Sequence, residues 1–228
     1  MISAVVVAGG KGKRIGRDIS KQYIKINEKE ILAWTLEVFE KSSEIDEIVL
    51  VVPGDDIEFC RKAIVDKYRF AKVRSIVAGG EERQYSVFNG LLSCSGKTEI
   101  VVIHDGVRPF INEGLIKRTI EESREFGACA AAVPVKDTIK VVDDKKFIIS
   151  TPDRKILYAV QTPQTFRYDL ILRAHREAME KNVLSTDDTA LVENIGYKVK
   201  LTHGDYFNIK ITTPEDLIFA EAILRNVK

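Results

Sequence analysis

Residues 5–23, VVVAGGKGKRIGRDISKQY, join an apolar run to a glycine-rich and strongly basic segment. Glycines allow backbone N–H groups to turn toward an anion and to approach it closely. Five cations fall within the eleven positions from 11 to 21: Lys11, Lys13, Arg14, Arg17 and Lys21. Arg14 can donate two hydrogen bonds to phosphate oxygens, and Lys21 can act as a mobile point charge. The segment predicts a loop that binds a polyanion such as a triphosphate; a solvated basic loop is the alternative, above all for Lys11, Lys13 and Arg17.

Two familiar phosphate-binding motifs are absent from this segment. The P-loop pattern G-x-x-x-x-G-K-[ST] fails from every glycine in it. In the dinucleotide pattern G-x-G-x-x-G, Gly10 and Gly12 have the first spacing, but Gly16 comes one residue late. The spacing therefore argues against a P-loop protein and against a dehydrogenase.

The elements that must position this loop alternate between strands and helices. Nearly continuous apolar runs, typical of strands covered on both faces, occupy residues 3–9, 47–53, 73–79, 99–105 and 128–135. Helical patterns occupy Ile31–Phe39, Ile57–Tyr68, Tyr85–Cys94, Leu115–Phe126, 168–181 and 187–195. We expect a single α/β domain over 1–228, with a Rossmann-like, mostly parallel sheet flanked by helices. Ligands bind at the carboxyl ends of such strands, so the loops that start at Gly9, Gly79 and Asp105 predict one shared site.

Two later segments complete the predicted fold. Residues 136–160 contain short alternating runs around the turn Asp143–Lys146, which predicts a β-arm projecting from the core; an ordinary surface hairpin is the alternative. Strands are predicted at 197–202 and 207–211. A last helix follows, with Thr213 as N-cap, Pro214 as its first residue and Asp216 as the capping carboxylate.

The bulk composition excludes several classes of protein. A net charge of +1 gives no overall field that would recruit nucleic acid or a membrane surface. Cys60, Cys94 and Cys129 form no C-x-x-C pair, which argues against a disulfide framework or a zinc site and for a reducing compartment. The first residues lack the features of a signal peptide, and no apolar run approaches the ~20 residues of a membrane span. We expect a cytoplasmic protein.

Several segments together resemble the cytidylyltransferases of isoprenoid and polyol-phosphate metabolism. Besides the opening loop, they are AGGEERQYSVFNGL (78–91), VVIHDGVRPF (101–110), AVPVKDTIK (132–140), AVQTPQTF (159–166) and NIKITTPEDL (208–217). The chain is most similar to the family of 2-C-methyl-D-erythritol 4-phosphate cytidylyltransferases, in the non-mevalonate pathway. The resemblance implies a condensation of CTP with the methylerythritol phosphate, releasing pyrophosphate. It further implies Mg²⁺ as cofactor and a homodimer formed through the arm at 136–160.

The resemblance also implies roles for individual residues. Arg14 and Lys21 resemble the pair that holds the CTP phosphates, and Lys210 resembles a third catalytic cation, bound to the substrate's phosphate. Asp105, at the end of an apolar strand, resembles the Mg²⁺ ligand, and Mg²⁺ prefers one or two carboxylates with phosphates and waters. The residues that resemble contacts of CTP are Ala8, Gly9, Gly10, Gly80, Glu81 and Ser86.

The resemblance implies a set of polyol-phosphate contacts: Arg108, Thr138, Arg154, Thr162 and Thr186. Thr138 and Arg154 lie on the predicted arm, and the resemblance implies that they reach the neighbouring subunit's site. Ordinary structural roles are the alternatives: a turn residue for Asp105, a surface lysine at 210 and a helix N-cap for Thr186. We expect His104 to be structural.

One position departs from the family's pattern, and two other functions compete. The family often has a second acidic residue three positions before the lysine at 210, where this chain has Phe207. Either Asp205 substitutes through a shifted loop, or Asp105 holds the metal with less help from the protein. A ribitol-5-phosphate cytidylyltransferase would share the phosphate contacts and differ only in hydroxyl contacts. A non-catalytic nucleotide-binding module is the other alternative, but mere binding would not require Arg14, Lys21, Asp105 and Lys210 to converge on one site.

Overall fold

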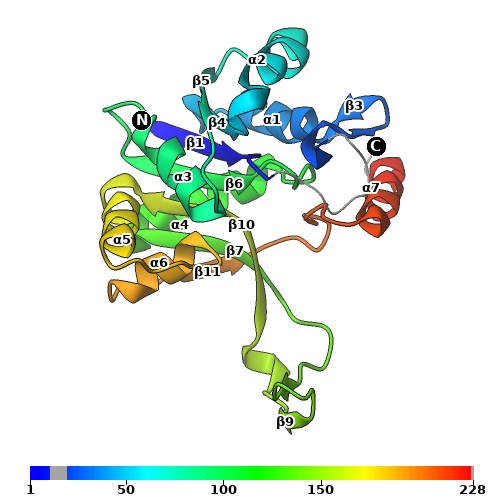
Figure 1. Cartoon of the computed structure of the whole chain (residues 1–228), viewed down its shortest axis with the longest axis vertical. Coiled ribbons are helices and arrows are strands. Elements are labelled where there is room, and N and C mark those ends of the chain that lie inside the picture. Colours follow the sequence, from blue (N-terminus) through cyan, green and yellow to red (C-terminus); the bar gives the residue numbers. More distant parts are fainter. Residues whose placement is uncertain (11–19, 227–228) are drawn as a thin grey trace.

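In the residues that the computed structural model describes, 1–10 and 20–226, the largest element is a seven-stranded sheet (Figure 1). Its order is β11 (Lys200–His203), β7 (Ala128–Pro134), β10 (Tyr158–Arg167), β6 (Ile100–Asp105), β1 (Ile2–Val7), β4 (Glu47–Val52) and β5 (Val73–Ala78). Neighbouring strands are parallel except where β10 pairs with β6 and β7. The predicted α/β fold with a mostly parallel sheet is confirmed.

Helices cover both faces of the sheet, because successive strand residues point to opposite faces. On one face, Ala4 and Val6 of β1 share a core with residues of α1 (Ile31–Lys41), the π-helix η4 (Arg61–Asp66) and α4 (Glu113–Phe126). On the other, Val5 and Val7 share a core with residues of α3 (Arg83–Leu92), α5 (Tyr168–Glu180) and α6 (Asp188–Asn194). Strands buried on both faces explain the continuous apolar runs of the sequence.

A third apolar cluster lies under the last helix, α7 (Pro214–Asn226), and includes Ile31, Val107 and Ile211. The helix begins as predicted, with Pro214 as its first residue. The Asp216 Oδ2 atom accepts hydrogen bonds from the backbone nitrogens of Thr212 and Thr213, at 2.7 and 2.8 Å. The remaining short elements of the core are η2 (Lys21–Tyr23), β2 (Lys25–Ile26), β3 (Lys29–Glu30), η3 (Gly54–Asp56) and α2 (Ile57–Cys60). None of the helices in the described part of the chain has the length and apolar character needed to cross a membrane.

Two segments differ from the prediction. The antiparallel strand β10 was not expected, because its buried stretch, 161–166, is mostly polar and contains a proline rather than an apolar run. The predicted strand at 207–211 is wrong. That segment is fixed by single contacts instead of a ladder: Asn208 Nδ2 donates to the carbonyl oxygen of Thr162 at 2.8 Å, and the backbone nitrogen of Ile211 donates to Val107 O at 2.9 Å.

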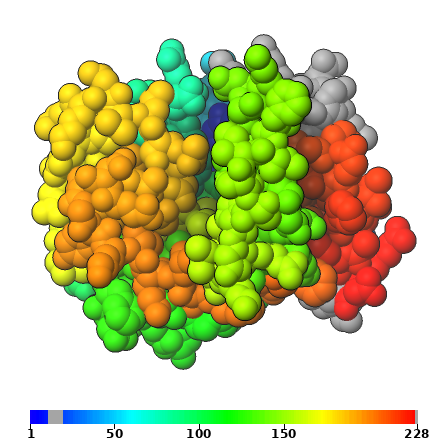
Figure 2. Space-filling view, turned by 90° about the horizontal axis from the view of Figure 1, so that it is seen from below, coloured from blue at the N-terminus to red at the C-terminus, as the bar shows by residue number. Residues whose placement is uncertain are grey.

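The chain between β7 and β10 forms the predicted arm. β8 (Val141–Val142) pairs antiparallel with β9 (Ile148–Ser150), and η5 (Arg154–Ile156) leads back to β10. Figure 1 shows this arm projecting away from the sheet, and Figure 2, from below, shows it as a yellow-green column between the orange segment with α6 and the red α7. Exposed apolar side chains run along it: Ile139, Val141, Val142, Phe147, Ile148, Ile149 and Ile156.

Candidate active site

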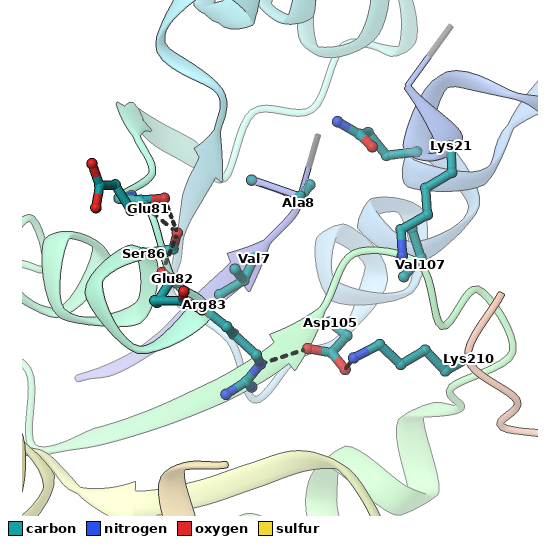
Figure 3. A pocket seen from close by; sticks show the side chains of 14 residues that line it. Val7, Ala8, Lys21, Glu81, Glu82, Arg83, Ser86, Asp105, Val107 and Lys210 are labelled. Atoms are coloured by element: carbon teal, nitrogen blue, oxygen red, sulfur yellow. Dashed lines mark hydrogen bonds and ion pairs between the residues drawn. The ribbon is translucent and has the colours of Figure 1, made fainter. Parts of the chain in front are cut away.

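A cavity of about 170 Å³ opens at the carboxyl ends of β1 and β6, where the sequence predicts the site. The predicted site residues that line it are Ala8, Gly9, Gly10, Lys21, Gly80, Glu81, Ser86, Asp105 and Lys210. Figure 3 shows Lys21 and Lys210 on one side of the cavity, with Glu81 and Ser86 on the opposite side and Asp105 between. Segments from both ends of the chain therefore meet at one place.

Two glycine loops close around Ser86 at one end of this cavity. The Ser86 Oγ atom accepts a hydrogen bond from the backbone nitrogen of Gly80 at 3.1 Å and donates one to Glu82 O at 3.2 Å. A Cβ atom on Gly79 would lie 2.8 Å from Ser86 Oγ, and one on Gly9 would lie 3.2 Å from it. The absence of side chains at these two positions lets the loops after β1 and β5 approach the start of α3.

The carboxylate of Asp105 is held by three cations. Arg83 Nε lies 3.1 Å from Oδ1, while Lys210 Nζ lies 2.8 Å and Arg108 Nε 3.7 Å from Oδ2. Burial by itself would raise the pKa of Asp105, but the charges of Arg83, Lys210 and Arg108 outweigh it and hold the pKa well below its usual range. Asp105 is therefore ionised at neutral pH, and three positive charges surround it.

A second cavity, of about 120 Å³, adjoins the first. Both cavities are lined by Arg83, Asp105 and Lys210, so this cluster stands between them. The second cavity also contains three residues predicted to contact the polyol phosphate: Arg108, Thr162 and Thr186. The arrangement can hold two anionic groups side by side, one in each cavity.

His104 and Thr162 fix the backbone beneath the cluster. The Thr162 Oγ1 atom accepts a hydrogen bond from the backbone nitrogen of Asp105 at 3.1 Å and lies 3.1 Å from His104 Nδ1. His104 Nε2 lies 3.2 Å from the carbonyl oxygen of Arg108. Burial lowers the pKa of His104 to about 4, so the ring is neutral at ordinary pH. Both ring nitrogens have partners in the backbone or in Thr162, which agrees with a structural role for His104.

Two predicted residues of the arm are not brought to this site within one chain. Thr138 and Arg154 lie exposed on the arm, where Arg154 Nη1 donates to Lys136 O at 2.6 Å, and neither lines either cavity. Arg14 lies outside the described residues, as do Lys11, Lys13 and Arg17. Thr186 is not the N-cap of α6: Asp187 takes that position and accepts from Ala190 N at 3.0 Å.

Asp105 is the predicted ligand of a divalent cation, and it lines both cavities. Asp205, the acidic residue near the position of Phe207, lines neither cavity, and its Oδ1 accepts a hydrogen bond from Phe207 N at 2.9 Å. Among residues 1–10 and 20–226, no three His, Cys, Asp or Glu side chains cluster in a way that could hold a metal. Asp105 alone still fits Mg²⁺, which takes one carboxylate when phosphates and waters supply the other oxygens.

Arg83 is a site residue that sequence reasoning missed. It stands between the two cavities and bridges Asp105 to Asp188, whose Oδ2 lies 2.8 Å from Arg83 Nη1. The available signal was its position in GGEERQYS, a segment already assigned to the nucleotide, at the first turn of a helix. Its partners are 22 and 105 residues away, so spacing gave no hint of them.

Comparison with known proteins identifies the family. The model of the family "IspD: 2-C-methyl-D-erythritol 4-phosphate cytidylyltransferase" matches residues 2–226. The chain belongs to this family. The 2-C-methyl-D-erythritol 4-phosphate cytidylyltransferase of Alkaliphilus oremlandii (strain OhILAs) is 52% identical over 223 residues, which cover 98% of this chain and 94% of that protein.

Solved structures of the IspD family have the same fold. The 4-diphosphocytidyl-2C-methyl-D-erythritol synthase from Anaerococcus prevotii DSM 20548 matches with a TM-score of 0.87 and 40% identity, covering 98% of this chain and 96% of that one. The 2-C-methyl-D-erythritol 4-phosphate cytidylyltransferase from Thermus thermophilus matches with a TM-score of 0.79 and 29% identity, covering 97% and 98%. The family that the sequence motifs predict is confirmed over nearly the whole chain.

Proposed function

We propose that this chain is a cytidylyltransferase that condenses CTP with 2-C-methyl-D-erythritol 4-phosphate in non-mevalonate isoprenoid biosynthesis. An oxygen of the polyol's phosphate attacks the α-phosphorus of CTP and forms a new P–O bond. The bond from that phosphorus to the oxygen bridging to the β-phosphate breaks, and pyrophosphate leaves with the electron pair. The attacking phosphate is ionised at neutral pH, so the reaction requires no general base.

The observation that carries this proposal is the cluster of Arg83, Asp105 and Lys210 shared by two adjoining cavities. Joining a phosphate to a triphosphate brings together groups that repel each other. Cations fixed where charge gathers in the transition state lower that barrier, and phosphoryl-type transfer needs little else from a protein. Two adjoining cavities that share two cations, Arg83 and Lys210, suit this requirement better than they suit the binding of a single nucleotide.

Each cation has a proposed task. Lys21, which lines the first cavity, holds the CTP phosphates together with Arg14, the residue outside the described part of the chain. Lys210 reaches both cavities and binds the phosphate of the polyol, as does Arg108 in the second cavity. Thr162 and Thr186 line the second cavity as further contacts of the polyol phosphate.

The nucleoside and the metal occupy the first cavity in this proposal. The backbone of Ala8, Gly9, Gly10, Gly80 and Glu81 contacts the nucleoside, and Ser86 holds the two glycine loops together. Asp105 is the residue that would hold Mg²⁺. When bound, that ion supplies positive charge that neutralises the CTP phosphates.

The arm is proposed to form a homodimer. The apolar side chains exposed along it, together with Thr138 and Arg154, suit a contact in which these two residues reach the partner's second cavity. In this proposal, residues 1–228 act as one nucleotidyltransferase domain. The protein works in the cytoplasm, where its cysteines stay reduced.

Pyrophosphate release tests the proposed function. The protein is incubated with CTP, Mg²⁺ and one polyol phosphate. One reaction contains 2-C-methyl-D-erythritol 4-phosphate, and a separate reaction contains ribitol 5-phosphate. We expect release with the first polyol phosphate and only background with the second. Release with ribitol 5-phosphate alone would reassign the substrate, and no release with either would indicate a nucleotide-binding module without this activity.

A further inference from the structure

The guanidinium of Arg83 divides its hydrogen bonds between two carboxylates. Its Nε donates to Asp105 Oδ1 at 3.1 Å, and its Nη1 donates to Asp188 Oδ2 at 2.8 Å. An arginine beside a single carboxylate commonly forms two parallel hydrogen bonds and so contacts both oxygens. The second carboxylate prevents that arrangement here, and Arg83 contacts only one oxygen of Asp105.

Asp188 is fixed from several sides in the protein interior. Its Oδ1 lies 3.2 Å from His175 Nε2, and its backbone nitrogen donates to Gln164 Oε1 at 3.1 Å. The side chains of Asp188 and His175 are 1% and 0% exposed, and neither lines either cavity. This pair therefore does not meet the substrates directly; the Asp188 carboxylate connects to the cavities through Arg83.

The other oxygen of Asp105 is held differently. Lys210 Nζ lies 2.8 Å from Oδ2, and the Lys210 side chain is 37% exposed. Arg108 Nε stands further off, at 3.7 Å, while Arg108 Nη1 donates to Asn208 O at 2.8 Å. A lysine is a point charge on a flexible stem, so it can leave this oxygen without breaking a forked contact.

We propose that Asp188 and His175 are positioning residues that hold Arg83 on Oδ1 of Asp105 and so keep Oδ2 for exchange between Lys210 and a divalent cation. The inference rests on the proposed function, in which Mg²⁺ and CTP meet at Asp105. Lys210 occupies Oδ2 in the free protein. A divalent cation held by Asp105 would replace Lys210 at this carboxylate, and the Lys210 ammonium would then be available to a substrate phosphate.

Two physical effects make Asp188 necessary in this scheme. Without its carboxylate, Arg83 is free to pair with both oxygens of Asp105 and to cover the one that the cation needs. The charge balance changes as well. In the wild type, the carboxylates of Asp105 and Asp188 balance part of the charge of Arg83, Arg108 and Lys210. After loss of the Asp188 charge, Asp105 alone balances these three cations, and the larger excess of positive charge repels an arriving cation more strongly.

The test is direct binding of Mn²⁺, used as a paramagnetic replacement for Mg²⁺, to the protein saturated with CTP. Free Mn²⁺ is measured by electron paramagnetic resonance for the wild type, Asp188→Asn and Arg83→Lys. We expect both variants to bind Mn²⁺ about 10- to 100-fold more weakly, the usual effect of removing a residue that orients a metal ligand. Asp169→Asn is the matched control, because the Asp169 side chain is 70% exposed and forms its ion pair with Arg167, away from the cluster; it should bind as the wild type does.

Kinetics supply a second readout. Raising Mg²⁺ should restore most of the turnover of Asp188→Asn, whereas a variant that is merely misfolded would not respond to the metal. Equal Mn²⁺ affinity in Asp188→Asn and the wild type would overturn the inference. If circular dichroism shows that Asp188→Asn does not fold, the Arg83→Lys variant decides. The lysine ammonium in that variant cannot donate to two carboxylates as the Arg83 guanidinium does. Mn²⁺ affinity equal to that of the wild type in Arg83→Lys would also overturn the inference. Failure of the proposed function is distinct, because the wild type itself would then release no pyrophosphate.

Discussion

At the scale of the residue, the site is organised by charge rather than by an acid–base pair. His104, which precedes Asp105 in the chain, is neutral, and both of its ring nitrogens have hydrogen-bond partners. Asp105 is ionised and paired with Arg83 and Lys210. Such a site can bring anions together and stabilise the charge of their transition state. This is the chemistry that transfer between phosphates requires.

Lys21 provides the residue-scale prediction. Lys21→Ala should lower kcat about 100- to 1,000-fold, the typical effect of removing one group that stabilises transition-state charge, while the Kd for CTP changes far less. Stopped-flow turnover and equilibrium CTP binding measure the two quantities. Lys25→Ala is the control, since Lys25 is exposed and lines neither cavity. An unchanged kcat in Lys21→Ala would remove Lys21 from the proposed mechanism.

At the scale of the element, helix α3 decides where Arg83 and Ser86 stand. Both residues lie at its start, and the helix packs on β1 and β4 through the second apolar core. Gly90, near its end, allows this close packing. A Cβ atom on Gly90 would lie 2.5 Å from Val5 Cγ1 and 2.9 Å from Val51 Cγ2. Both contacts are with buried strand residues, which cannot move aside without disturbing the sheet.

Gly90→Ala should therefore destabilise the protein, although alanine favours a helix by about 1 kcal/mol over glycine. We expect the free energy of unfolding to fall by about 1–3 kcal/mol, the usual range for overpacking a core, when measured by urea denaturation. Gly96→Ala is the matched control, because no atom would lie within 4 Å of its Cβ. A Gly90→Ala variant that is more stable than the wild type would contradict this prediction, because it would show that α3 can move away from the sheet without a loss of stability.

At the scale of the whole molecule, the arm projects from the sheet and exposes large apolar side chains. Its large apolar side chains are exposed, and Phe147 and Ile149 are 68% and 65% exposed. Within the described residues of one chain, Thr138 and Arg154 contact neither cavity. Both features agree with an arm that is completed by a second copy.

Charges on the arm should separate the proposed dimer. We expect the double variant Phe147→Asp, Ile149→Asp to sediment as a monomer, because it would bury two carboxylates in an apolar contact. Its KM for the polyol phosphate should rise, because Thr138 and Arg154 would no longer reach the partner's second cavity, while its Kd for CTP stays close to that of the wild type. Lys145→Asp, on the exposed turn of the same arm, is the control for added charge. A wild-type protein that is monomeric and fully active would contradict the proposed homodimer.

The parts of the fold that the sequence predicts are those with a repeating physical signal. Strands buried on both faces produce apolar runs, and the predicted runs at 3–9, 47–53 and 99–105 match β1, β4 and β6. The turn of the arm and the cap of α7 were predicted because few residue types satisfy their backbone geometry. Strand β10 escaped prediction because most of its buried side chains are glutamines and threonines, which are held by specific hydrogen-bond partners and produce no periodic apolar pattern.

The sequence by itself determined the family, the α/β class and the loops that supply the site, because these depend on local composition and on motifs that stay intact along the chain. Only the tertiary structure decided that Arg83 joins Asp105 to Asp188, that Asp205 serves a turn and that two cavities share one cluster. These facts depend on which residues meet across long separations. Pairing between charges acts through space, and only the folded chain brings those charges within a few ångströms of one another.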